Sequence, residues 1–151
     1  MKDTLDPDTA RKDRMGLMAK SAEGRLPALL EAAMPRPAFS WLRPPEVGSV
    51  MVRGRAGGTG APFNLGEMTV TRCALKLASG EVGHAYVQGR RKADAEAAAL
   101  VDALMQTDAA PALRDTVLAP LETEAADRRA ARAGKAAATK VDFFTMVRGE
   151  D

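Results

Sequence analysis

The sequence is poor in the residues that build most metal sites and nucleophiles. Its 151 residues include one cysteine, Cys73, and one histidine, His84. A single cysteine excludes an internal disulfide, and a structural zinc site needs several ligands of these two types. We therefore expect no metal site, and we interpret Cys73 as a small buried apolar residue. The low cysteine count, with a polar N-terminus that has no signal-peptide core, indicates a cytoplasmic protein.

Aromatic residues and long apolar runs are scarce as well. One Trp, one Tyr and four Phe leave the core to be built mainly from Ala, Leu, Val and Met. No run approaches the roughly 20 apolar residues of a membrane helix. Lys plus Arg number 22 and Asp plus Glu number 20, so the net charge of +2 gives no nucleic-acid signature. The length fits one domain with one core.

The segment 47–77 has the pattern of two strands joined by a glycine-rich loop. Val50 and Val52 alternate with other residue types, the period of a half-buried strand, and 68–77 is rich in β-forming residues. A third strand at 83–88 follows a hairpin turn in which Gly80 supplies the unusual dihedral angle. The three runs predict a small antiparallel sheet.

Alternation along these strands predicts one apolar face and one basic face. The apolar face would carry Val50, Val52, Leu75, Leu77, Ala85 and Val87. The basic face would carry Arg53, Arg55, Arg72, Lys76, Tyr86 and Gln88. This assignment assumes strands without bulges, because a slip of one residue reverses a strand. A helix at 93–106, with apolar residues at helical spacing, is expected to cover the apolar face.

The loop and its flanking arginines form a candidate anion site. Glycine amides can form a concavity that binds anions, and arginine side chains bind phosphate through paired N–H groups. The candidate ligands are Arg55, Gly57, Gly58, Thr59, Gly60 and Arg72. The alternative is an ordinary loop whose glycines only provide unusual dihedral angles. The segment matches neither a Walker loop nor a Rossmann fingerprint.

Helical segments are expected on both sides of the sheet. One helix begins near Ala10, capped by Asp8 or Thr9, and a second begins near Pro27 and stops at Met34. Together they make an N-terminal helical arm at 8–34, followed by a connector at 38–46 that holds Trp41. Arg90, Arg91 and Lys92 precede the covering helix and are either solvated charges or functional residues.

The C-terminal part is expected to form a second arm, at 111–151. A short helix at 112–118 would end at Pro120, and an alanine-rich helix at 122–140 would follow. The last residues are unusually apolar for a terminus, which predicts a tail that docks on the sheet or on a partner. The candidate docking residues are Val141, Phe143, Phe144, Met146 and Val147. The whole chain is thus an α+β domain with helical arms at both ends, its sheet and covering helix lying at 47–106.

Several segments together resemble the PhnG family, from about Arg11 to the C-terminus. They are Met-Val-Arg-Gly-Arg at 51–55, Gly-Gly-Thr-Gly at 57–60, Phe-Asn-Leu-Gly-Glu at 63–67, Thr-Arg at 71–72, Gln-Gly-Arg at 88–90, Asp-Ala-Leu-Met-Gln at 102–106, Pro-Leu at 120–121 and, most diagnostic, Val-Asp-Phe-Phe-Thr-Met-Val-Arg-Gly at 141–149. PhnG is the small subunit of the bacterial carbon–phosphorus lyase core complex.

The resemblance implies a subunit that assembles with PhnH, PhnI and PhnJ, two copies of each. With PhnH, PhnI and PhnL-like subunits it would support transfer of a phosphonate to the ribose C1′ of MgATP, with release of adenine. MgATP would be a substrate of the complex, and this chain alone would bind no cofactor, nucleic acid or membrane. The alternatives from the residues are a stand-alone enzyme acting on a phosphorylated nucleoside and an RNA-binding module, the latter disfavoured because few aromatics are available for stacking.

Overall fold

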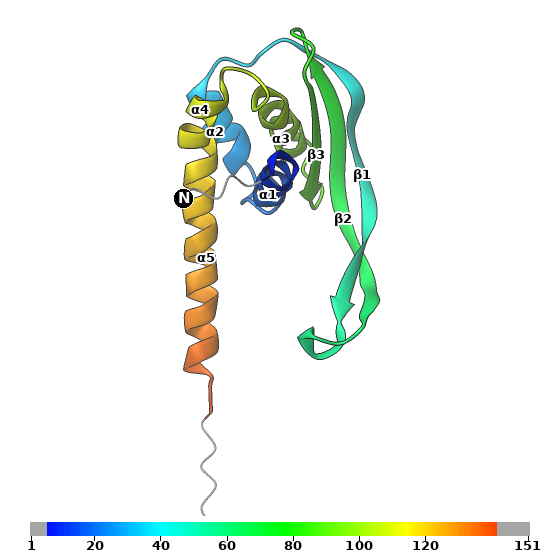
Figure 1. Ribbon diagram of the computed structural model, residues 1–151, viewed down its shortest axis with the longest axis vertical. Coiled ribbons are helices and arrows are strands. Elements are labelled where there is room, and N and C mark those ends of the chain that lie inside the picture. Colours follow the sequence, from blue (N-terminus) through cyan, green and yellow to red (C-terminus); the bar gives the residue numbers. More distant parts are fainter. Residues whose placement is uncertain (1–5, 142–151) are drawn as a thin grey trace, which may run out of the picture.

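The computed structural model describes residues 6–141 (Figure 1). The elements are, in order, α1 (Pro7–Ala19), α2 (Arg25–Ala33), β1 (Phe39–Arg55), the 3₁₀ turn η1 (Ala56–Gly58), β2 (Pro62–Leu77), β3 (Val82–Gln88), α3 (Lys92–Leu104), α4 (Ala110–Leu113), the π-helical turn η2 (Arg114–Leu118) and α5 (Ala119–Ala138). This is the predicted α+β arrangement of a small antiparallel sheet, a covering helix and helices at both ends.

The core lies between α3 and the sheet, whose strand order is β1-β2-β3 with both pairs antiparallel. The predicted covering helix is confirmed, because α3 packs on β2 and β3. Leu75, Val87, Leu100 and Val101 are completely buried in this layer. On its other side α3 contacts α1 and α2, so it is covered almost all round (Figure 1).

Gly83 sets how closely α3 approaches β3. A Cβ atom at this position would lie 1.9 Å from the carbonyl oxygen of Ala99 and 2.9 Å from the Cβ of Ala103. Both neighbours belong to α3, so the backbone of the strand touches the helix directly. Ala99 and Ala103, four residues apart on one face of α3, have the small side chains that this approach requires.

The N-terminal helices form largely as predicted, with one difference at the first cap. Asp6 caps α1, its carboxylate accepting a hydrogen bond of 3.3 Å from the backbone N–H of Thr9. The prediction of Asp8 or Thr9 is wrong because Pro7 occupies the first helical turn, where its fixed φ suits a helix and its missing N–H costs nothing. The second helix begins after Gly24, at φ 74°, and ends at the extended Met34.

Strand β1 begins much earlier than predicted, and the expected connector at 38–46 is wrong. Phe39 pairs with Leu77, and Trp41 packs edge-on against Phe39 with ring centroids 4.9 Å apart. Two prolines are tolerated inside this strand because it is an edge strand and because its register shifts between Trp41 and Arg43 and between Arg43 and Glu46.

The predicted faces are right for β2 and β3 and wrong for β1. Leu75, Leu77, Ala85 and Val87 are buried against α3. Val50 and Val52, however, pair with Met68 and Gly66, which alternate with the core-facing residues of β2. They therefore lie on the opposite face, because the register shifts near the start of β1 displace its pairing from the assumed one.

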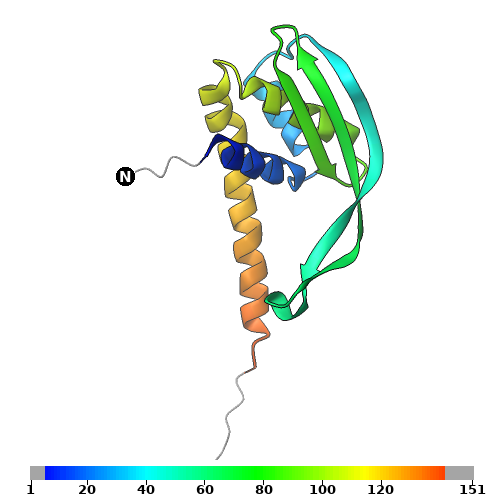
Figure 2. The same ribbon diagram turned by 45° about the vertical axis from the view of Figure 1, so that its right-hand side comes forward.

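The two long strands continue as a ribbon beyond the body of the protein. Strand β3 pairs only with residues 70–76 of β2, so 49–55 of β1 and 62–69 of β2 have no third strand beside them. We call this two-stranded extension the ribbon. Figures 1 and 2 show it projecting from the body in the same direction as the far half of α5.

The C-terminal helices are continuous, so the predicted stop at Pro120 is wrong. A π-helical turn at Arg114–Leu118 precedes the proline, and the N–H of Ala119 bonds to the carbonyl of Arg114, five residues back. This wider turn accommodates a ring that an α-helix interior would exclude. Of the 20 residues of α5 only Leu121 is buried. Within residues 6–141, no helix combines the length and apolarity needed to cross a membrane.

Replacing Gly83 with Ala should destabilise the protein by about 2–3 kcal/mol or more, the upper part of the range for overpacked cores. The added methyl group meets backbone atoms of α3, which cannot move without separating helix and strand. Urea unfolding followed by circular dichroism measures the change. Gly48→Ala is the matched control, because its Cβ meets nothing within 4 Å, and an equal loss in both variants would contradict the role of close approach.

Candidate functional site

The glycine-rich loop closes the tip of the ribbon. Gly57 and Gly58 have φ values of 59° and 80°, which residues with side chains rarely adopt. The N–H of Gly60 bonds to the carbonyl of Ala56 at 2.8 Å, and a Cβ on Gly60 would lie 2.7 Å from that oxygen. Three of the four predicted loop ligands are therefore glycines that the turn itself requires. The alternative of an ordinary loop, whose glycines only provide unusual dihedral angles, predicts this for the three positions.

Arg55 lies beside this loop and partly belongs to it. Its Nη1 donates a hydrogen bond of 3.1 Å to the carbonyl of Gly60. Arg55, Arg53, Gly54, Gly58 and Pro62 line an open hollow of about 540 Å³. Both arginines are exposed and neither forms an ion pair within residues 6–141. The hollow thus has cationic side chains, and Thr59 lies exposed on the same turn.

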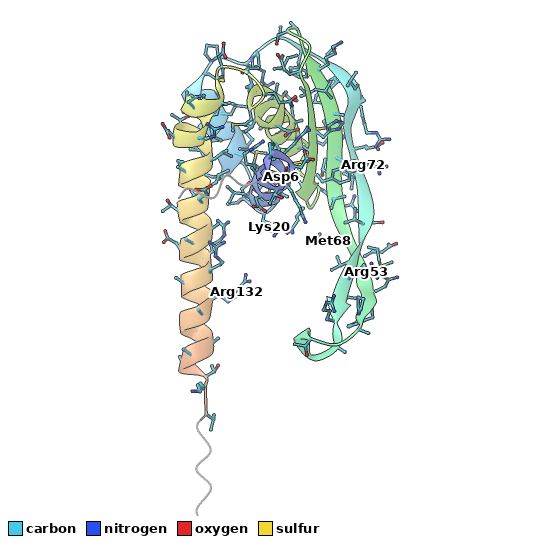
Figure 3. The ribbon with its side chains drawn as sticks, in the orientation of Figure 1. Asp6, Lys20, Arg53, Met68, Arg72 and Arg132 are labelled. Atoms are coloured by element: carbon cyan, nitrogen blue, oxygen red, sulfur yellow. The ribbon has the colours of Figure 1, made fainter. Side chains whose placement is uncertain are left out.

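Arg72 is not brought to this loop. It lies in β2 ten positions after Pro62, which at roughly 3.3 Å per residue places it about 33 Å along the strand. Its Nε bonds to Oε1 of Glu46 at 2.7 Å, and this hydrogen bond, with the carboxylate charge, raises the pKa of Arg72. The labels of Arg53 and Arg72 in Figure 3 show the separation. The six predicted ligands therefore do not form one site.

The docking residues fall mostly beyond the described part of the chain. Val141 is exposed on 66% of its surface just after α5. Phe143, Phe144, Met146 and Val147 lie outside the described residues 6–141. Their role in docking stays a prediction.

Cys73 and His84 lie in different environments, since Cys73 is buried and His84 is exposed. Cys73 is buried, its thiol donates to the carbonyl of Ala95, and desolvation raises its pKa to about 12. The thiol is therefore protonated at neutral pH, and the interpretation of Cys73 as a buried apolar residue is confirmed. Among the described residues, no group of three or more His, Cys, Asp or Glu side chains is arranged to hold a metal ion.

A buried carboxylate that the sequence reading missed joins three elements. Asp102 of α3 is 1% exposed and accepts hydrogen bonds from Arg11 Nε and Nη2 of α1, at 2.9 and 2.7 Å. It also accepts from the backbone N–H of His84 in β3, at 3.0 Å. The signals in the sequence were an acid between the apolar residues Val101 and Leu104 of the covering helix and its place in the family motif at 102–106.

Arg91, one of the three cations at 90–92 around the start of α3, is a further side chain that connects elements. Its guanidinium donates to the carbonyls of Gln88, Ser21 and Ala19 and lies 3.7 Å from Asp94. It therefore joins the end of β3 to the turn between α1 and α2. Arg90 and Lys92 are exposed. The interpretation as a solvated charge is wrong for Arg91, because its side chain is only 12% exposed and connects these elements.

A groove of about 1320 Å³ is lined by residues of α1 and of η2–α5 together. Its basic side chains are Lys12, Arg14, Lys20, Arg114, Arg128, Arg129 and Arg132, and its acidic side chains are Asp13, Asp115 and Glu122. We call it the basic groove. Figure 3 labels Lys20 at the end of α1 and Arg132 on the α5 side. The sequence reading missed it because the cations come from segments about 100 residues apart, although the cluster at 128–132 was visible.

Comparison with known proteins places the chain in a family. The family described as "Phosphonate metabolism protein PhnG" matches residues 9–149. A protein of Rhizobium meliloti (strain 1021), named "Alpha-D-ribose 1-methylphosphonate 5-triphosphate synthase subunit PhnG", is 48% identical over 145 residues. The aligned region covers 93% of this chain and 90% of that protein.

Proposed function

The chain belongs to the PhnG family, and on this premise we propose that it is an accessory subunit of an α-D-ribose 1-methylphosphonate 5-triphosphate synthase. The observation that carries the proposal is the 48% identity to such a subunit along nearly the full length of both chains. In the proposed reaction a phosphonate displaces adenine from the ribose C1′ of MgATP, and the 5-triphosphate is kept. MgATP is a substrate of the complex, and this chain by itself binds no cofactor.

The chemistry of the described residues supports an accessory role. The Cys73 thiol is buried and protonated, and residues 6–141 hold no cluster of metal-ligating side chains. These observations favour a subunit that positions or completes a catalytic partner over a stand-alone enzyme acting on a phosphorylated nucleoside.

The exposed face of the ribbon supports a role in assembly. Val47, at the base of the ribbon, and Met51, within it, pair with Thr71 and Glu67, which have the same parity as the core-facing residues of β2. These residues therefore continue the core face beyond the cover of α3. Val47, Met51, Phe63 and Leu65 are all exposed, and two-stranded ribbons are marginally stable in water. A partner that covered this surface would stabilise the ribbon.

The proposed partners are PhnI, PhnH and PhnJ, in a cytoplasmic assembly with two copies of each core subunit, together with a PhnL-like protein for the transfer reaction. These partner names follow from the resemblance of this chain's motifs to the PhnG family. The catalytic groups for displacement of adenine would then belong to a partner chain.

Reconstitution tests the function directly. The chain purified alone should be self-associated or poorly soluble and should form no product from MgATP and methylphosphonate, because exposed apolar surfaces such as the ribbon need a partner. Co-expression with the partner subunits should give a soluble complex that releases adenine. Omission of this chain should abolish that release. A well-behaved monomer with turnover would overturn the accessory role.

We further propose that Arg55 and the hollow at the tip of the ribbon bind part of a phosphate-rich ligand of the complex. Arg55→Lys should lower triphosphate product formation about tenfold, since lysine cannot reproduce the paired N–H donors of arginine. Assembly should stay intact. Arg72→Lys is the matched control and should have little effect, because Arg72 is paired with Glu46 far from the tip. Loss of assembly in Arg55→Lys would instead make Arg55 a structural residue.

The C-terminal tail is proposed to dock on a partner subunit. Each large apolar side chain that becomes buried contributes about 1.5–3 kcal/mol before ordering costs, so several suffice for stable docking. Deleting residues 141–151, or changing Phe143 and Phe144 together to Ser, should release the chain from PhnI while the circular dichroism of the sheet is kept. Co-purification is the measurement, and retained co-purification would shift the docking surface to the helical arms or the ribbon.

A further inference from the structure

The basic groove has an excess of positive charge that no ion pair within the described residues neutralises. Seven cationic and three acidic side chains line it, and none of the seven forms an ion pair within residues 6–141. By contrast Arg11, next to the groove on α1, is fully engaged with Asp102. A concentration of like charge destabilises the compact state unless an anionic partner offsets it.

The upper end of the groove is formed by Arg14 and Arg114. Arg14 is partly buried, and its pKa is lowered mainly by desolvation; the charges of Arg114 and Arg11 lower it further, while the charge of Asp102 raises it. The lower end is formed by Arg128, Arg129 and Arg132, which lie within about one turn of α5. Arg128 reaches the carbonyl of Lys20 at 3.5 Å, which joins this cluster to α1.

The size of the groove indicates what kind of anion it fits. Its volume of about 1320 Å³ exceeds the roughly 300–1,000 Å³ of small-molecule pockets. Its cations extend from Arg114 to Arg132, 18 residues of helix or about 27 Å, which is longer than a triphosphate. The helical walls include Ala10, Gly16, Ala119 and Ala125, whose small side chains let another backbone approach closely.

From these features we infer that the basic groove binds an acidic segment of another subunit of the complex, laid along α5. This inference rests on the proposed function, since it requires a partner chain. Carboxylates spaced along that segment would pair with the cations at both ends of the groove. The contact would cover the exposed near half of α5, of which only Leu121 is buried in this chain.

Carbodiimide cross-linking of the reconstituted complex tests the inference. This reagent joins a lysine amine to a carboxylate in direct contact, and Lys12 and Lys20 supply the amines. Mass spectrometry should find Lys12 or Lys20 joined to Asp or Glu of one partner segment, and the yield should fall at high salt. Cross-links from both lysines only to acids of this chain, Glu150 and Asp151 included, would overturn the inference.

A set of charge variants provides the second measurement. Arg128→Gln, Arg129→Gln and Arg132→Gln together should weaken assembly about tenfold at moderate salt, with helix content unchanged because Gln is a good helix former. Arg90→Gln, Lys92→Gln and Lys135→Gln form the matched control, since these three cations are exposed and lie outside the groove. Equal affinity of the two triple variants would contradict the inference.

Two further results separate the alternatives. Tripolyphosphate binding to the complex that is lost in the groove variant, with assembly unaffected, would make the groove a small-anion site and overturn the inference. Wild-type chain that fails to join the partner subunits would overturn the proposed function, and the inference with it. Wild-type assembly combined with an unaffected groove variant overturns the inference alone.

Discussion

The structure depends on the contact between α3 and β3, and on the carboxylate that fixes it. Asp102 is buried in α3 and accepts hydrogen bonds from the backbone of His84 and from the guanidinium of Arg11. A buried charge is costly unless it is paired and hydrogen-bonded, so α1, α3 and β3 must keep this relative position. Gly83, the neighbour of His84, removes the side chain that would otherwise hold helix and strand apart.

This compact body supports two extensions that it does not cover. The ribbon continues the core face of the sheet with exposed apolar residues, and α5 continues the π-helical turn with almost no buried side chain. The helix propensity of its alanines and the packed turn from which it starts both favour this helix. Exposed apolar residues on such extensions contribute little to the stability of the isolated chain, and they are typical of surfaces that a partner covers. This agrees with the similarity to a protein named as a subunit of a synthase.

The distribution of charge follows the same division. Within the body, Arg11 and Arg91 are satisfied by buried acids or carbonyls, and they join elements far apart in the sequence. In the basic groove and at the tip of the ribbon, the arginines form no ion pair among residues 6–141. The paired cations thus stabilise the fold, and the unpaired ones remain available to ligands or partner chains.

The sequence by itself determined the fold class, the hairpin at Gly80, the covering helix and the buried state of Cys73, because each follows from local periodicity or from one residue's chemistry. It also determined the family through motifs along most of the chain. Only the tertiary structure decided the faces of β1, where bulges shift the register, and the continuity of the last helix past Pro120, where a π-helical turn makes room. The separation of Arg72 from the loop and the meeting of α1 with α5 were likewise decided in space, because non-local pairing leaves no periodic signal in the residues that take part.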